Sequence, residues 1–134
     1  MTELITGSCL CGTVVFEITG EFSHFFLCHC SRCQKGTGSA HAANLFSTTA
    51  VINWCSGQEK IKVYRVPETQ HSRSFCSACG SAVPNMQMGG ELLVVPAGSL
   101  DSQISIRPNA HICTSSRAMW DSNLAAIPEV DNLP

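Results

Sequence analysis

The chain has 134 residues, of which 44% are hydrophobic and only 13% are charged, and its formal net charge is -2. The eight Lys and Arg residues are scattered, which argues against a basic surface that follows the phosphates of a nucleic acid. No window comes near the roughly 18 consecutive apolar residues of a membrane span, and the first residues lack the basic and apolar segments of a signal peptide. These features predict one domain over residues 1–134, located in the cytoplasm, with neither a nucleic acid nor a membrane as partner.

Short apolar and β-branched runs, separated by glycine and proline, predict a mainly β fold. The best strand candidate is residues 13–19, and a short helical turn is expected over residues 31–35. Gly89-Gly90 is expected to close a hairpin. No stretch of about 15 residues has the apolar periodicity of a long helix. The other expected strands are residues 25–28, 41–46, 50–54, 60–66, 81–88, 91–95, 104–107 and 111–114.

Nine cysteines are many for a chain that shows no sign of export, and their number is odd. In a reducing compartment, clustered cysteines bind metal more often than they form disulfides. Two intervening residues allow a tight turn to direct both sulfurs at one ion, and one intervening residue places them on the same face of an extended segment. Zinc, which takes thiolates in a tetrahedron, is the metal that such spacings favour. Seven of the nine cysteines have these spacings: Cys9 with Cys11, Cys28 with Cys30 and Cys33, and Cys76 with Cys79.

Seven ligands divide naturally into four and three. Cys28, Cys30 and Cys33 can bind one ion by themselves and leave its fourth position to water or a substrate. The closed structural site would then be formed by Cys9, Cys11, Cys76 and Cys79. The spacing also permits a single closed site formed by Cys30, Cys33, Cys76 and Cys79, with the other cysteines free. Thiol exchange by Cys76 and Cys79 is a further alternative.

The remaining cysteines and the histidines carry no clear signal. Cys55 and Cys113 stand apart from the three groups, and we expect both to be small buried apolar residues. His29 lies between two candidate ligands, so on an extended segment it should point away from the metal. His41 and His111 suit a pocket or a packed interior equally well, and no general base is assigned.

The three cysteine groups, in this order, resemble the glutathione-dependent formaldehyde-activating enzyme family, also called the GFA or CENP-V/GFA domain family. Pro108, His111 and Trp120 follow in the order of its C-terminal pattern. The resemblance extends over about Gly7 to Trp120, and Gln34 stands where relatives often carry arginine. The matching stretches are Gly7-Ser8-Cys9-Leu10-Cys11-Gly12, Cys28-His29-Cys30-Ser31-Arg32-Cys33-Gln34-Lys35 and Phe75-Cys76-Ser77-Ala78-Cys79-Gly80.

The resemblance implies a Mss4-like fold, a tent of β-sheets held by zinc. It implies that Cys28, Cys30 and Cys33 bind a second, catalytic zinc ion. The other four residues match the structural zinc ligands of the family: Cys9, Cys11, Cys76 and Cys79.

The founding enzyme of this family adds glutathione to formaldehyde, giving S-(hydroxymethyl)glutathione, and the family is classed with carbon–sulfur lyases. The resemblance therefore implies two zinc ions and a small-molecule thiol or its aldehyde adduct as partner. Because an open site with three ligands should bind zinc less tightly than a closed one, we expect the second ion to be only partly retained. The alternative is a non-catalytic zinc module that binds another protein. A fourth protein ligand at the second site would favour that alternative, and an open position beside a pocket would favour the enzyme.

Overall fold

The computed structural model describes residues 3–134 and consists mainly of short strands, with one α-helix, α1 (Ser31–Thr37), in that part of the chain. The predicted mainly β fold is confirmed. Within residues 3–134 no helix has the length and apolar character needed to span a bilayer. The strands are β1 (Glu3–Ser8), β2 (Val15–Gly20), β3 (His24–Cys28), β4 (Ala42–Ser47), β5 (Val51–Ser56), β6 (Ile61–Arg65), β7 (Ser72–Cys76), β8 (Ala82–Val83), β9 (Asn85–Gln87), β10 (Leu92–Pro96) and β11 (Ala110–Ile112).

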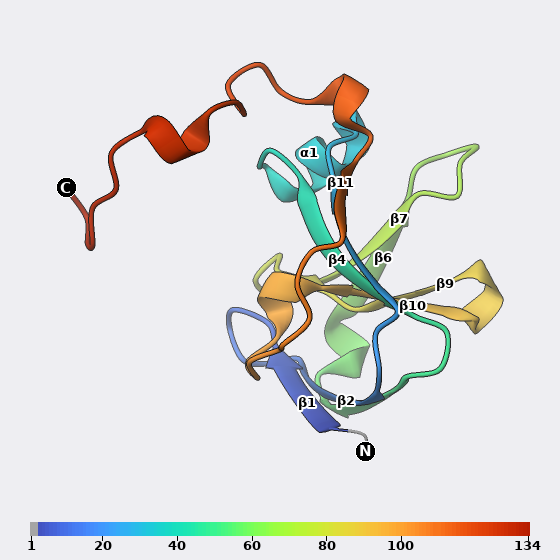
Figure 1. Cartoon of the computed structure of the whole chain (residues 1–134). Helices are drawn as coiled ribbons and strands as arrows, with labels where there is room; N and C mark the ends of the chain where they lie inside the picture. The colour runs from blue at the N-terminus through green and yellow to red at the C-terminus, as the bar shows by residue number, and fades with distance from the viewer. Residues whose placement is uncertain (1–2) are drawn as a thin grey trace.

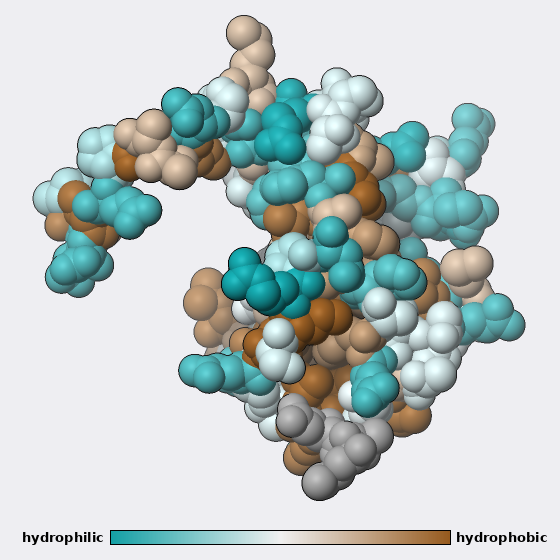
Figure 2. Space-filling view, viewed as in Figure 1, coloured by the Kyte–Doolittle hydropathy of each residue, from teal (hydrophilic) through white to brown (hydrophobic). Residues whose placement is uncertain are grey.

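These strands form three sheets, with the orders β1-β2-β5, β11-β3-β4-β10-β9 and β6-β7-β8. All neighbouring strands are antiparallel except β11, which runs parallel to β3. Figure 1 shows β1 and β2 at the lower end of the molecule and α1 at the upper end, while the last residues of the chain extend away from the body. In Figure 2 hydrophilic residues prevail around the upper end, and more apolar surface is visible below it.

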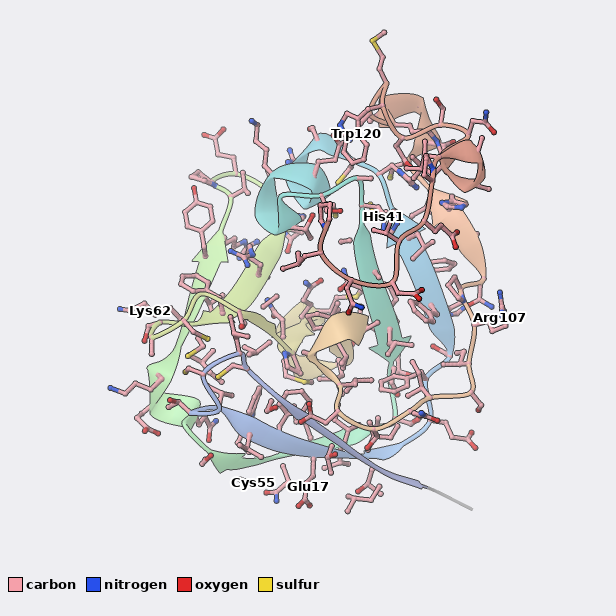
Figure 3. The ribbon with its side chains drawn as sticks, turned by 90° about the vertical axis from the view of Figure 1, so that its left-hand side faces the viewer. Glu17, His41, Cys55, Lys62, Arg107 and Trp120 are labelled. Carbon is pink, nitrogen blue, oxygen red and sulfur yellow. The ribbon has the colours of Figure 1, made fainter. Side chains whose placement is uncertain are left out.

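The main core lies between the first two sheets. Phe16 and Ile18 of β2 are fully buried and meet Leu45 and Leu93 of the five-stranded sheet. Glu17, between the two buried residues, points outward in Figure 3, as the two-residue period of a strand requires. Burial of this apolar surface is the main stabilising contribution to the fold.

A second, smaller core holds the third sheet against the first. Val14, immediately before β2, and Val83 of β8 are buried together with Cys9 and Cys76. Two cysteines are thus part of an apolar cluster, which fixes the positions of their sulfurs.

Tertiary pairing overrides several expectations drawn from the sequence. Neither β1 nor β7 was predicted, because their serine, arginine and threonine residues give a weak strand pattern, yet both pair along their full length with a neighbour. The strand predicted at residues 104–107 does not form, and Ile104 and Ile106 instead pack against the main core. The predicted hairpin exists between β9 and β10, but the segment before it is divided at Pro84, which has no N–H to donate.

Gly7 of β1 marks a close approach between the first sheet and the η3 turn (Ala97–Ser99). A Cβ atom at Gly7 would lie 2.6 Å from the carbonyl oxygen of Ser99 and closer still to the ring of Phe16. We expect Gly7→Ala to lower the free energy of unfolding by about 1–3 kcal/mol, because a backbone atom and a core ring must both shift. The measurement is urea denaturation.

The matched control is Gly98→Ala, because a Cβ atom there meets no atom within 4 Å. Gly98→Ala should leave the urea midpoint within experimental error of wild type. Equal midpoints for the two variants would show that the approach at Gly7 relaxes without cost.

Candidate metal centres

Four cysteines from two distant turns meet at one point. We call Cys9, Cys11, Cys76 and Cys79 the four-cysteine group. Cys9 and Cys11 lie in the turn between β1 and β2, while Cys76 ends β7 and Cys79 lies in the turn before β8. Their Sγ atoms all lie within 4.8 Å of one another, with 3.6 Å between Cys9 and Cys11. The structure therefore brings the turn of Cys9 and Cys11 to the turn at residues 77–81. The alternative site, in which Cys30 and Cys33 would join Cys76 and Cys79, is not the one that the structure forms.

Each turn of the four-cysteine group is closed by a glycine whose N–H donates back to the carbonyl of the first cysteine of its pair. The N–H of Gly12 donates to the carbonyl of Cys9 at 3.1 Å, and the N–H of Gly80 donates to that of Cys76 at 2.7 Å. Both glycines have a φ of 79°, a conformation that side chains disfavour. The N–H of Val14 also donates to the Sγ of Cys9 at 3.2 Å. Each turn thus directs its sulfurs to the same side.

The thiols of the four-cysteine group differ in acidity. Hydrogen bonds with Ser81 lower the pKa of the Cys79 thiol to about 5, and hydrogen bonds with Thr13 lower the pKa of Cys11. Burial raises the pKa of the enclosed Cys76 thiol. Four thiolates so close together repel one another, and a dication among them would remove that repulsion. The donor set therefore fits a metal ion that prefers sulfur, such as zinc.

The other three clustered cysteines, Cys28, Cys30 and Cys33, form the three-cysteine group, at the junction of β3 and α1. Their Sγ atoms also lie within 4.8 Å of one another. Cys30 is the N-cap of α1, and its Sγ accepts a hydrogen bond from the N–H of Cys33 at 3.4 Å. None of the three is fully buried, whereas Cys9 and Cys76 are. The three-cysteine group is thus half-buried throughout, whereas the four-cysteine group combines two buried thiols with the exposed Cys11.

The acidity of the three-cysteine group also points to a cation. Burial, followed by the neighbouring thiols, raises the pKa of Cys33, and burial raises that of Cys28. The pKa of Cys30 is lowered: burial opposes ionisation, but hydrogen bonds with the backbone of Cys33 outweigh it. Without a cation, the lowered pKa of Cys30 favours ionisation of this thiol, and the raised pKa values of Cys28 and Cys33 oppose ionisation of the other two. A divalent cation would allow all three to ionise, so this donor set also fits zinc.

Cys113 is not the buried residue that was expected. It is exposed and directly follows Ile112, which pairs with Cys28 in the parallel register of β11 and β3. Burial raises the pKa of the Cys28 thiol, and the adjacent thiol of Cys113 raises it further. Cys55 is exposed as well and lies near Glu17 at the opposite end of the molecule (Figure 3). Both expectations were wrong, because an isolated place in the sequence does not determine the burial of a thiol.

A cavity of about 590 Å³ opens beside the three-cysteine group. Cys28 and Cys33 line it, together with residues of α1, β4, β7, β8, β9 and β10. A small molecule in this cavity can therefore reach two of the three sulfurs.

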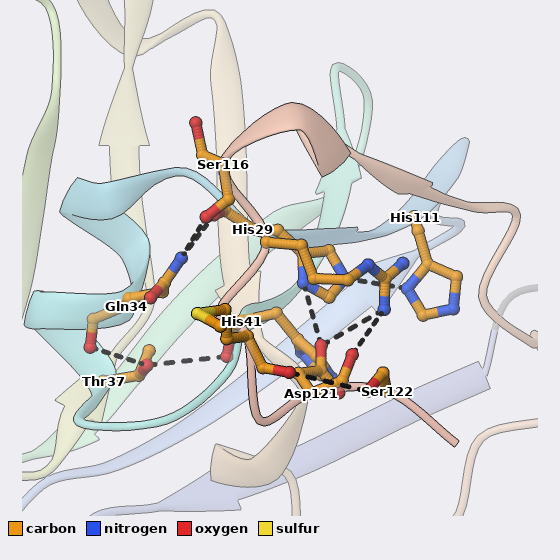
Figure 4. A network of polar contacts seen from close by, with 10 residues as sticks. His29, Gln34, Thr37, His41, His111, Ser116, Asp121 and Ser122 are labelled. Carbon is orange, nitrogen blue, oxygen red and sulfur yellow. Dashed lines mark hydrogen bonds and ion pairs between the residues drawn. The ribbon is translucent and has the colours of Figure 1, made fainter. Parts of the chain in front are cut away.

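Behind the three-cysteine group lies a cluster of histidines that the sequence did not reveal (Figure 4). His29 is fully buried, and its Nε2 lies 2.8 Å from Nδ1 of His111. Its Nδ1 lies 3.2 Å from a carboxylate oxygen of Asp121, an ion-pair distance without the alignment of a hydrogen bond. Arg117 contacts the same oxygen at 3.2 Å, and the ring of His41 lies 5.1 Å from that of His29.

This cluster makes His29 a structural link. Burial, and then the charges of Arg117 and His41, lower the pKa of His29, which favours the neutral imidazole. Because Nε2 of His29 contacts His111 and Nδ1 faces Asp121, neither ring nitrogen is free for a substrate. The other members of the cluster lie between 12 and 92 positions from His29 in the sequence, and no local sequence pattern predicts their contact.

Gln34 adds a second link between α1 and the C-terminal part of the chain. Its side-chain N–H₂ donates to the carbonyl of His29 at 2.7 Å and to that of Ser116 at 2.8 Å (Figure 4). The amide thus ties the loop of the three-cysteine group to the η4 turn (Thr114–Ser116).

Comparison with known proteins points to one family. The family model described as "Glutathione-dependent formaldehyde-activating enzyme" matches residues 4–116. A Halomonas elongata protein named "Putative glutathione-dependent formaldehyde-activating enzyme" is 30% identical over 124 residues, which cover 87% of this chain and 79% of that protein. The crystal structure of a Rhodobacter sphaeroides protein matches with a TM-score of 0.56 at 22% identity, over 79% of this chain and 98% of that one. This last likeness concerns the fold alone. The family has a Mss4-like fold, in agreement with the mainly β structure.

We expect Asp121→Asn to lower the free energy of unfolding by about 1–3 kcal/mol, because it removes the charged partner of Arg117 and of the buried His29. Thermal denaturation measures the effect. Asp131→Asn removes the same charge from the exposed C-terminal segment and should not change the melting temperature. Melting temperatures that agree for wild type and Asp121→Asn would contradict a structural role for this cluster.

Proposed function

The chain belongs to the glutathione-dependent formaldehyde-activating enzyme family, and we propose that it is a zinc-dependent carbon–sulfur lyase. Its substrate would be the adduct of a small thiol, such as glutathione, with a small aldehyde, such as formaldehyde. The observation that supports this proposal best is the position of the three-cysteine group, whose half-exposed sulfurs border a cavity of about 590 Å³. A purely structural metal site has no need of such a cavity.

The two cysteine groups would have different tasks. The four-cysteine group supplies a full tetrahedral set of ligands, two of them in an apolar core, and would hold a structural zinc ion. The three-cysteine group supplies three ligands and would hold the second zinc ion. When bound there, zinc supplies an open position at which the thiol of a substrate is stabilised as thiolate.

The net reaction needs little from the protein beyond placement. The sulfur of the thiol forms a bond to the carbonyl carbon, and the carbonyl oxygen becomes a hydroxyl with the proton that the thiol gave up. The reverse reaction breaks the carbon–sulfur bond and releases the aldehyde. Three thiolate ligands reduce the Lewis acidity of the metal, which favours holding a thiol over generating hydroxide. The helix cap at Cys30 and the end of β3 keep the three sulfurs in place for this task.

One observation favours a second candidate function. Cys113 directly follows Ile112, which pairs with Cys28. Its thiol is not among the three sulfurs that lie within 4.8 Å of one another, and it would close the three-cysteine site if it became a fourth ligand. A closed site has no position for a substrate, and the chain would then be a non-catalytic zinc module that binds another protein.

We expect two zinc ions per chain in the wild type and one in Cys30→Ala, with the second ion removed by a chelator at a lower concentration than the first. The physical reason is that three half-exposed ligands bind zinc less tightly than four. Metal analysis during a chelator titration measures both numbers. Cys55→Ala, which removes a distant exposed thiol, should retain two ions. Release of both ions at the same chelator concentration would contradict the division into a closed and an open site.

Cobalt absorption separates the two candidate functions, because sulfur-to-cobalt charge-transfer bands grow with the number of thiolate ligands. For the lyase, Cys113→Ser leaves these bands unchanged, and glutathione strengthens them by adding a thiolate. For the protein-binding module, Cys113→Ser weakens the bands, and glutathione does not alter those of the wild type. The measurement is a glutathione titration of both cobalt-loaded proteins.

A further inference from the structure

The cavity beside the three-cysteine group has a cationic wall. Two arginines, Arg32 and Arg73, line it together with His71, Cys28 and Cys33. Among the lining residues in the described part of the chain there is no aspartate or glutamate. The whole chain has only eight Lys and Arg residues against ten Asp and Glu, so two arginines without a nearby acid are an unusual concentration.

The two arginines are not neutralised within the protein. In residues 3–134 the ion pairs involve Asp121 with His29 and with Arg117, and none involves Arg32 or Arg73. Guanidinium groups always carry their charge. Arg32 is exposed and Arg73 half-buried at the wall of the cavity, and a concave site lined by charges of one sign concentrates their potential.

Arg73 is held in position by its neighbours. It lies on β7, and its guanidinium carbon is 5.2 Å from the centre of the Phe75 ring. A Cβ atom at Gly36 of α1 would be 3.5 Å from the Cδ of Arg73, so the aliphatic stem lies close to the helix. A side chain fixed in this way loses less entropy when it binds a ligand.

Arg32 comes from the other side of the cavity, one residue before Cys33 on α1. The fields of the two arginines overlap at His71: burial lowers the pKa of this histidine, and the charges of Arg32 and then Arg73 lower it further. The cationic wall therefore combines residues of two segments that are far apart in the sequence, and it lines the same cavity as Cys28 and Cys33.

We infer that this cavity selects small thiols that carry a carboxylate, with Arg32 and Arg73 binding the carboxylate while the thiol reaches the three-cysteine group. The inference rests on the proposed function and defines its substrate class as acidic thiols. Planar guanidinium groups match a carboxylate in charge and geometry. Neutral thiols of the same size lack this interaction, and cationic thiols are repelled.

The test compares two thiols of similar size on the cobalt-loaded full-length protein. We expect 3-mercaptopropionate to perturb the charge-transfer bands with an affinity about tenfold or more above that of 2-mercaptoethanol, as charge-assisted hydrogen bonds predict. Arg73→Gln and Arg32→Gln should each reduce this ratio severalfold, and Arg73→Lys should retain part of it. Arg107→Gln removes the same charge from an exposed position that does not line the cavity (Figure 3) and should leave the ratio unchanged.

The outcomes separate the inference from the function on which it rests. Equal affinities of the wild type for the two thiols, or a ratio that both arginine-to-glutamine variants retain, would overturn the inference and leave the lyase proposal intact. If neither thiol changes the spectrum, the lyase proposal fails, and a calorimetric titration with S-methylglutathione, which has carboxylates but no free thiol, decides the inference. Binding that Arg73→Gln abolishes would support the anion site, and no binding to the wild type would refute it.

Discussion

Repulsion between crowded thiolates is the constraint on which the arrangement of this protein depends. Seven sulfurs are gathered into two groups, in each of which all sulfurs lie within 4.8 Å of one another. Without a cation, full ionisation is opposed in both groups: burial raises the pKa of Cys76, and burial followed by the neighbouring thiols raises that of Cys33. A dication at the centre of each group would convert this repulsion into attraction and would make metal binding part of the folding free energy. The two groups differ in what surrounds them, and this difference separates their tasks.

The four-cysteine group closes the fold. The sulfurs of Cys11 and Cys76 are 4.0 Å apart although 65 positions separate them in the sequence. The smaller core of Val14 and Val83 lies beside them and is continuous with two of the sulfurs. A metal ion there joins the sheet of β1 and β2 to that of β7 and β8, with the entropic advantage of a cross-link over a long loop. The three-cysteine group, in contrast, lies within six residues of the chain and closes no long loop, so its place beside a cavity requires another explanation.

The parts of this protein that follow from local spacing could be predicted from the sequence, and those that follow from tertiary pairing could not. Two-residue and one-residue gaps between cysteines limit where their sulfurs can point, which is why both groups could be predicted. The histidine cluster depends on β11 pairing with β3, a contact between segments about 80 residues apart. Since residues 111–114 read as a weak strand with no indicated partner, neither the contact of His111 with His29 nor that of Cys113 with Cys28 could be inferred.

The C-terminal part of the chain determines from which side a ligand can approach the three-cysteine group. His29, Gln34 and the residues that they contact occupy one side of the β3–α1 loop and are joined there by hydrogen bonds and ion pairs. The cavity lies on the other side, where it is lined by Cys28 and Cys33 and by the arginines of α1 and β7. A thiol bound in the cavity therefore has its sulfur near Cys28 and Cys33 and its remaining groups toward Arg32 and Arg73. Because the buried His29 lies on the opposite side and both of its ring nitrogens have partners there, selectivity among thiols would come from the cationic wall.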